Sequence, residues 1–234
     1  MSNDKFIPIS LPSRCLAYPI PVGTDIRIRP FKGREQELMA ELNMPNLSKR
    51  LLTILENVFQ GIDVRKLTVG DAEYAMIWEA INSYSNKRSI NLICGQCEKS
   101  ITVEIDLMLL EKIELSDEYK DVANRTLNLS SLGEIELRLL TLQDDINAFE
   151  FSQLSKDASS YLYSYASSIV NGKDVLANRE MLEEADAKDL QKIVEWHQKY
   201  KHGVDLTSKY VCPLCKKEGF VHLPFRLATF FPFL

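Results

Sequence analysis

The sequence predicts an α+β fold in which two β-hairpins are separated by a long insertion. Two Cys-x-x-Cys pairs, Cys94/Cys97 and Cys212/Cys215, each lie between short runs of alternating apolar and polar residues, the pattern of a hairpin. Other segments repeat apolar residues every three or four positions, which is typical of amphipathic helices. Hydrophobic residues make up 45% of the 234 residues, enough to bury a core.

The first region, residues 1–85, is expected to hold an extended arm, a strand and helices. The proline-rich stretch from residue 11 to residue 22 is extended, and the alternation in Thr24–Pro30 predicts a strand that ends at the proline. A weak helical pattern covers residues 34–43. Asn46 is then a candidate cap for a helix that ends before Gly61.

A helix is also expected after Thr68-Val-Gly-Asp71, which has the spacing of a capping box. The residues that follow place one apolar stripe on this helix, formed by Tyr74, Ile77, Trp78 and Ile81.

Residues 86–108 and 206–226 are predicted to form the two hairpins, each with two cysteines at its tip. The first hairpin has one apolar face on its outgoing strand, formed by Ile101, Val103, Ile105 and Leu107. The second repeats this plan, with Tyr210 before its cysteines and Val221, Leu223 and Phe225 after them.

The two cysteine pairs predict one metal ion in a Cys₄ shell. A Cys-x-x-Cys pair supplies two thiolates to one ion, and Cys94, Cys97, Cys212 and Cys215 complete a tetrahedron. Four thiolates leave no open coordination position, so we expect structural Zn²⁺ in a split zinc ribbon. Iron in place of zinc, two disulfides, and loss of the metal stay open as alternatives. Cys15 is left over and is expected to act as a small apolar side chain.

The 114 residues between Cys97 and Cys212 far exceed the roughly 15–20 of a compact Cys₄ module, so residues 109–205 must form a folded insert. A hairpin is predicted over residues 125–140. Helices are predicted near residues 143–155, 158–170 and 186–200.

The composition of the chain and its lack of catalytic motifs argue against several classes of function. The net charge of −5 argues against a protein that wraps nucleic acid or coats an anionic membrane. No apolar run approaches the ~20 residues of a membrane span, and the N-terminus lacks the apolar core of a secretory signal. No catalytic motif is present, and the three histidines suggest core or surface positions rather than a base. We therefore expect a binding protein in a reducing compartment, not an enzyme.

The C-terminal tail, residues 227–234, is apolar to its end. Such a segment either packs on its own domain or docks on a partner. Three aromatic side chains so close together favour the second alternative, with Phe230, Phe231 and Phe233 as partner-binding residues.

The order of short motifs resembles one known family. These motifs are Leu11-Pro-Ser with Tyr18, an Arg-x-Arg-Pro strand end, Leu67-Thr-Val-Gly-Asp71, Gly203-Val-Asp-Leu-Thr before Cys212, and Phe230-Phe-Pro near the end. Together they resemble the baseplate hub and hub-assembly chaperone family of contractile-tailed bacteriophages of the T-even type. This chain departs from the family pattern at Arg14-Cys15, where a Lys-Gly-like turn is expected.

The resemblance implies an assembly protein that binds other phage tail proteins and catalyses no reaction, in the virion baseplate or in the host cytoplasm during assembly. A homo-oligomer is compatible with this reading. The competing hypothesis is a zinc-ribbon protein that binds nucleic acid or acts in transcription. Steeply salt-dependent binding to DNA or RNA would distinguish it.

Overall fold

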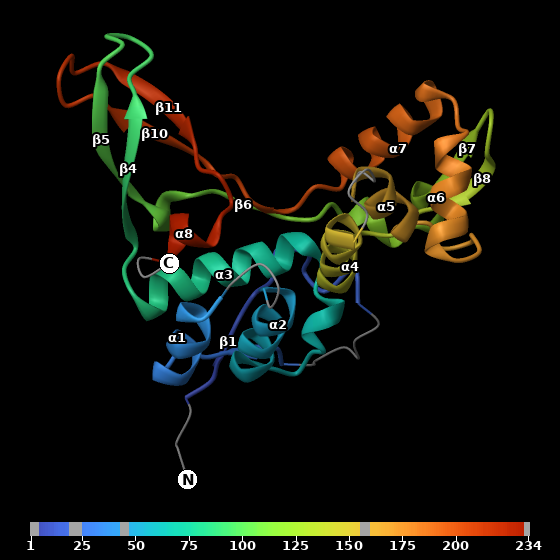
Figure 1. Cartoon of the computed structure of the whole chain (residues 1–234), viewed down its shortest axis with the longest axis horizontal. Helices are drawn as coiled ribbons and strands as arrows, with labels where there is room; N and C mark the ends of the chain where they lie inside the picture. Colours follow the sequence, from blue (N-terminus) through green and yellow to red (C-terminus); the bar gives the residue numbers. More distant parts are fainter. Residues whose placement is uncertain (1–4, 19–24, 43–46, 155–159, 232–234) are drawn as a thin grey trace.

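The protein has a base from which two arms rise (Figure 1). The computed structural model describes residues 5–18, 25–42, 47–154 and 160–231, with only the backbone of Leu47 and Ser48. One arm consists of the two hairpins that carry the cysteines, and the other is the insert. The fold is α+β, as predicted.

The base combines a small antiparallel sheet with three helices. The sheet has the order β1-β2-β3, and its strands are β1 (Ile7–Pro8), β2 (Arg27–Ile28) and β3 (Phe59–Gln60). The helices are α1 (Gly33–Ala40), α2 (Leu47–Val58) and α3 (Val69–Ser83), with a 3₁₀ turn, η2 (Val64–Lys66), before α3. The strand predicted from Thr24 is thus only two residues long.

Helix α3 begins where the sequence predicts. The Thr68 hydroxyl caps it by accepting a hydrogen bond from the Asp71 N–H at 3.3 Å. The predicted apolar stripe is only partly covered, since Ile77 is buried and Tyr74, Trp78 and Ile81 are half-buried. The small and apolar residues between them are also buried, because α3 lies centrally in the base; they include Ala72, Ala75, Met76 and Ala80.

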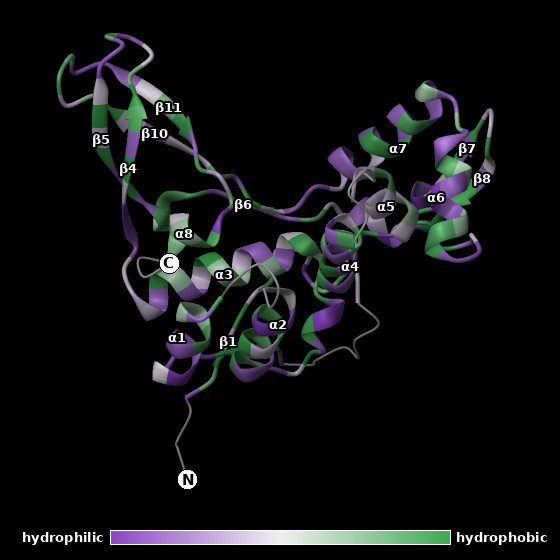
Figure 2. Ribbon diagram, in the orientation of Figure 1, coloured by the Kyte–Doolittle hydropathy of each residue, from purple (hydrophilic) through white to green (hydrophobic). Residues whose placement is uncertain are grey.

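Both predicted hairpins are present. In the first, β4 (Lys87–Ile93) pairs with β5 (Ser100–Asp106); in the second, β10 (Thr207–Val211) pairs with β11 (Glu218–His222). Hydrophobic and hydrophilic residues alternate along β5, which gives the first hairpin one apolar face (Figure 2). The second hairpin also exposes Val211 and Phe220. Strands β5 and β10 lie against each other, which joins the hairpins into one arm.

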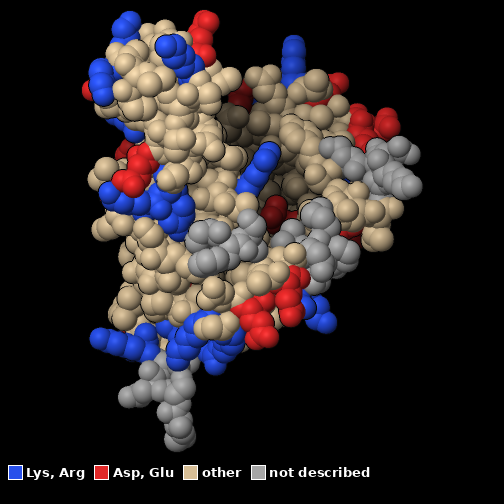
Figure 3. Space-filling model, turned by 60° about the vertical axis from the view of Figure 1, so that its left-hand side comes forward, with Lys and Arg blue, Asp and Glu red and all other residues tan. Residues whose placement is uncertain are grey.

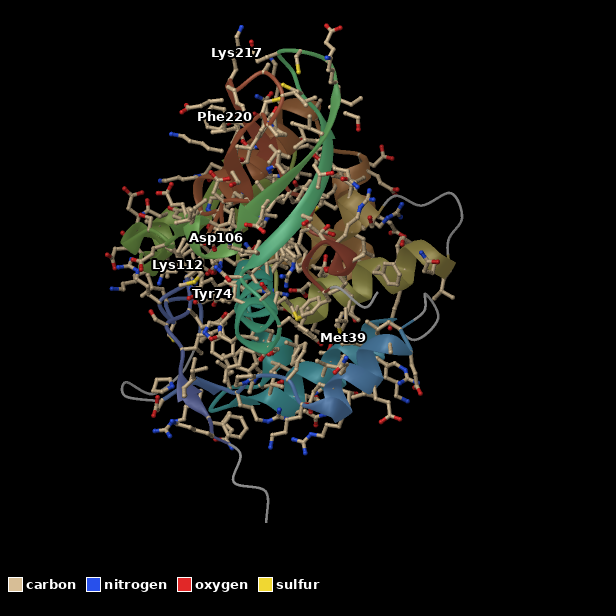
Figure 4. All side chains as sticks on the ribbon, turned by 90° about the vertical axis from the view of Figure 1, so that its left-hand side faces the viewer. Met39, Tyr74, Asp106, Lys112, Lys217 and Phe220 are labelled. Carbon is tan, nitrogen blue, oxygen red and sulfur yellow. The ribbon has the colours of Figure 1, made fainter. Side chains whose placement is uncertain are left out.

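A two-strand ladder that the sequence did not indicate closes the insert. Strand β6 (Lys112–Ile113) pairs antiparallel with β9 (Gly203–Val204). The chain therefore enters and leaves the insert side by side, at the foot of the hairpin arm. In Figure 4, Asp106 and Lys112 mark this foot above Tyr74 of α3, while Phe220 and Lys217 lie far out on the arm.

The insert has a hydrophobic core of its own. Its elements are the 3₁₀ turns η4 (Asp117–Lys120) and η5 (Val122–Arg125), the hairpin β7 (Thr126–Leu129) and β8 (Gly133–Glu136), and the helices α4 (Leu142–Leu154), α5 (Ser160–Ser167), α6 (Val175–Glu183) and α7 (Ala187–Lys199). All buried members of this core fall between Leu115 and Tyr200. The base and the hairpin arm share the other core, to which the 3₁₀ turn η3 (Leu107–Leu109) also contributes.

The C-terminal tail packs in the protein's own core. Helix α8 (Leu227–Phe230) brings Phe230 and Phe231 to 1% and 2% exposure, and Phe231 stacks on Phe31 with ring centroids 5.7 Å apart. The buried Arg88 guanidinium fixes this position by donating to the carbonyl oxygen of Phe230. Phe230 and Phe231 therefore pack on their own domain and do not form the partner-binding surface that the sequence favoured, since their rings are buried. Phe233 lies outside the described residues.

Candidate metal centre

The four predicted cysteines meet at the outer end of the hairpin arm. Their sulfur atoms all lie within 4.8 Å of one another, although 114 residues separate the two pairs in the chain. Across the pairs, Cys94 Sγ lies 3.9 Å from Cys215 Sγ, and Cys97 Sγ lies 3.9 Å from Cys212 Sγ. Both hairpins therefore contribute equally to one cluster.

The two cysteine turns are built in the same way. In each, the N–H of the residue after the second cysteine bonds to the carbonyl oxygen of the first: Glu98 to Cys94 at 2.8 Å, and Lys216 to Cys212 at 2.9 Å. Glu98 and Lys216 also share a left-handed backbone, with φ of 57° and 61°. The matching geometry shows that each pair is a turn shaped to present two sulfur atoms on one side.

Backbone dipoles favour thiolates at this cluster. The Gln96 N–H lies 3.4 Å from Cys94 Sγ, and the Cys215 N–H lies 3.5 Å from Cys212 Sγ. Hydrogen bonds from the backbone N–H groups of Cys97 and Gln96 lower the pKa of Cys94 to about 6, and the Cys215 N–H lowers the pKa of Cys212. Burial and the neighbouring cysteine side chains raise the pKa of Cys97 to about 11. The protein alone therefore favours the thiolate, which is the form that metal ions bind, at Cys94 and Cys212.

The spacing of the sulfur atoms fits a tetrahedral ion. A Zn–S bond of about 2.3 Å places the sulfur atoms of a regular tetrahedron about 3.8 Å apart. The two 3.9 Å separations match this value, whereas a disulfide would need about 2.05 Å. All five cysteines are free thiols, and Cys15 lies outside the cluster. The donor set is compatible with a metal and does not specify which one.

The histidines lie away from the cysteines. His197 packs between the rings of Tyr165 and Trp196, and burial lowers its pKa to about 4. This agrees with the core position expected for it. His222 is exposed at the end of β11 far from the cysteine turn, because it pairs with Thr207 at the start of β10. His222 therefore does not line the cysteine cluster.

A buried polar node joins two of the sequence motifs to His202, the residue before the Gly203 motif. The Ser13 N–H and the Tyr18 hydroxyl donate to the two oxygens of Asp71. The Thr68 N–H donates to the Tyr18 hydroxyl at 2.7 Å, and the Thr68 hydroxyl lies 2.6 Å from His202 Nε2. Residues 13–18, the cap of α3 and the residue before β9 therefore meet at one point. Residues 11–18 form hydrogen-bonded turns, so the extended arm predicted for this stretch is wrong over the described residues.

The tautomer of His202 follows from its second contact. His202 Nδ1 lies 3.1 Å from the carbonyl oxygen of Tyr200, which can only accept. Nδ1 is therefore the protonated nitrogen, and Nε2 accepts from the Thr68 hydroxyl. The sequence does not predict this contact between His202 and Thr68, because a lone histidine before a glycine carries no signal of a partner 134 residues away.

The chain matches the sequence model of a family described as T4 bacteriophage base plate protein over residues 16–232. It belongs to this family. The baseplate relationship indicated by the motifs is thus confirmed. Membership of the base plate protein family implies a structural component of the phage tail, with other tail proteins as partners.

Two further comparisons add no relative of this base plate protein, since no curated protein and no solved structure matches it. Within the described part of the chain, no helix is both long and apolar enough to cross a bilayer.

Proposed function

We propose that this protein assembles the tail baseplate by protein–protein binding, as a hub component or as a chaperone of hub assembly. It catalyses no reaction. It acts in the virion baseplate or in the host cytoplasm while the tail is being built. Membership of the base plate protein family carries this proposal.

The cysteine cluster is assigned a structural role in this function. Cys94, Cys97, Cys212 and Cys215 would hold one Zn²⁺, which makes the two hairpins the halves of a split zinc ribbon. A bound structural zinc supplies about 10–16 kcal/mol of apparent binding free energy in small peptides. Because β6 and β9 already close the insert, the ion holds only the hairpin arm together.

A phage that lacks this gene tests the function. We expect infected cells to accumulate tail parts without complete baseplates, and a plasmid copy of the wild-type chain to restore particles. Mass spectrometry of purified particles then separates the two roles, because a hub component stays in the virion and a chaperone does not. Normal particles from the deletion phage would contradict the proposal.

The same purified protein tests the competing hypothesis. A nucleic-acid-binding protein loses affinity steeply as salt rises, because phosphate contacts release counterions. We expect no salt-dependent binding to DNA or RNA from this acidic chain. Tight, salt-sensitive binding would favour the competing function.

A further inference from the structure

An apolar groove crosses the base between helices α2, α3, α4 and the C-terminal segment. Its volume is about 170 Å³, and its apolar walls include Leu51, Leu55, Met76, Leu142, Phe225 and Leu227. The groove is formed by four parts of the chain that lie far apart in sequence. Its walls therefore depend on the assembled fold and not on one loop.

Two carboxylates, one from each of two neighbouring helices, line this groove. Glu73 comes from α3 and Asp145 from α4, and among the described residues they are the only charged ones that line it. Neither side chain has a hydrogen bond or an ion pair with any residue that the structure describes. Figure 3 shows the molecule hollowed between its two arms, with both acidic and basic side chains at the hollow.

The two carboxylates are poorly compensated in the protein alone. Burial and the charge of Asp145 raise the pKa of Glu73, and the charge of Lys201 only partly offsets this. Partial desolvation and the charge of Asp144 likewise raise the pKa of Asp145, although this residue is exposed to solvent. A positive charge placed between them would relieve both effects, since an opposite charge favours the ionised carboxylates.

We propose that this groove is the docking site for another tail protein, which inserts a lysine or arginine side chain flanked by apolar residues. The carboxylates specify the charge of the occupant, and the leucine and phenylalanine walls specify its apolar flanks. Arginine fits both features, because its aliphatic stem packs on apolar surface while its guanidinium bonds to carboxylates. This inference rests on the proposed assembly function and names the partner's chemistry.

Paired peptides test the chemistry directly. The probe is acetyl-Leu-Arg-Leu-amide, with acetyl-Leu-Gln-Leu-amide as its uncharged match, each titrated into the full chain by NMR. We expect the arginine peptide to bind at least about tenfold more tightly. We expect Glu73→Gln/Asp145→Asn to remove that difference, and Glu180→Gln/Glu184→Gln, which removes two exposed charges on or beside α6, to keep it.

The same variants show whether the site is structural. Removing two uncompensated carboxylates should leave the melting temperature of the chain equal or higher, so lost binding cannot be ascribed to unfolding. Equal affinity for both peptides, or unchanged affinity in the groove variant, would overturn the proposal. A concentration-dependent dimer that the groove variant abolishes would also overturn it, by assigning the groove to a second copy of this chain.

Complementation of the deletion phage distinguishes a failure of the docking site from a failure of the proposed assembly function. If Glu73→Gln/Asp145→Asn restores full particle yield, the docking site is refuted while the assembly function stands. We expect a yield at least about tenfold below that of the wild type, with normal yield from Glu180→Gln/Glu184→Gln.

Discussion

At the scale of single residues, Arg88 connects the hairpin arm to the C-terminal tail. Its guanidinium donates to four carbonyl oxygens, those of Phe230, Ala80, Ser85 and Lys87, and the side chain is buried. A charged group this deep is stable only when its donors are satisfied. The tail thus stays in the core because one arginine binds its last helical carbonyl.

Replacing Arg88 by methionine should therefore destabilise the protein. The change keeps much of the apolar stem and leaves the carbonyl oxygens without their donor, which we expect to cost about 2–4 kcal/mol of unfolding free energy. Urea unfolding measures it. Arg27→Met is the control, because Arg27 is exposed and pairs with Asp25 at the surface, where a loss of at most about 1 kcal/mol is expected. Equal midpoints for the two variants would refute this role of Arg88.

Glu79 gives the protein a specific pH dependence. Its side chain is 0% exposed, and burial raises its pKa to about 8 despite hydrogen bonds from Ser83 and the Phe31 N–H. The unfolded chain releases this proton near pH 4.5 and the folded chain near pH 8. Between these values the folded state holds more protons, so the contribution of Glu79 to stability falls as pH rises.

Glu79→Gln should remove this fall, because glutamine resembles the protonated acid and does not titrate. We expect the difference in unfolding free energy between the variant and the wild type to shift in favour of the variant by about 2–4 kcal/mol from pH 5 to pH 8. This corresponds to roughly 1.4 kcal/mol per pKa unit. Chemical denaturation at the two pH values measures the difference. Parallel pH profiles would show that Glu79 is not held protonated.

At the scale of elements, the crossing of α3 with β9 needs glycine. A Cβ on Gly70 would lie 2.3 Å from the carbonyl oxygen of His202, which is backbone and cannot move aside. We expect Gly70→Ala to destabilise the protein by at least about 2 kcal/mol. Gly33→Ala is the matched control, since Gly33 begins α1 with open space around it. Similar melting temperatures for both variants would contradict the close crossing.

Removal of the proposed metal should loosen one arm only. The two hairpins meet at the cysteine cluster, whereas the insert has a separate core behind the β6–β9 ladder. After treatment with a chelator, we expect faster amide exchange in β4, β5, β10 and β11, and unchanged exchange in β7, β8 and α7. Exchange that rises throughout the chain would show that the ion supports both arms.

Much of the element order could be predicted from sequence because its signals are local. Alternation located both hairpins, and the Thr68 cap located the start of α3. The β6–β9 ladder could not be found, because two-residue strands have no periodicity and their partners lie 90 residues apart. Helix α6 was missed although Asp174 caps it by accepting from the Ala177 N–H, a signal that the sequence did contain.

The candidate site was more predictable than its surroundings. Cysteine spacing named all four members of the cluster, since thiolate pairs at this interval have few other uses. The burial of Phe230 and Phe231 could not be predicted, because it depends on Arg88, which is 142 residues away in the chain. The node around Asp71 likewise depends on tertiary contacts, such as the one between Ser13 and Asp71.

At the scale of the whole molecule, one base holds two arms by different means. The insert is fastened by the β6–β9 ladder and the polar node at Thr68, and the hairpin arm by the shared core, Arg88 and the cysteine cluster. Arg14 and Cys15 take left-handed conformations, with φ of 51° and 60°, where the family pattern suggests a Lys-Gly-like turn. Arg14 and Cys15 therefore hold backbone conformations that glycine tolerates better.

Metal content of the purified full chain tests the central claim most directly. Elemental analysis should find about one zinc per chain in the wild type and in Cys15→Ser, which removes the one cysteine outside the cluster. Cys94→Ser/Cys97→Ser should contain none, because two thiolates are lost from the shell. A wild-type chain that folds and melts cooperatively without bound metal would contradict the claim, and iron in place of zinc would correct the identity of the ion.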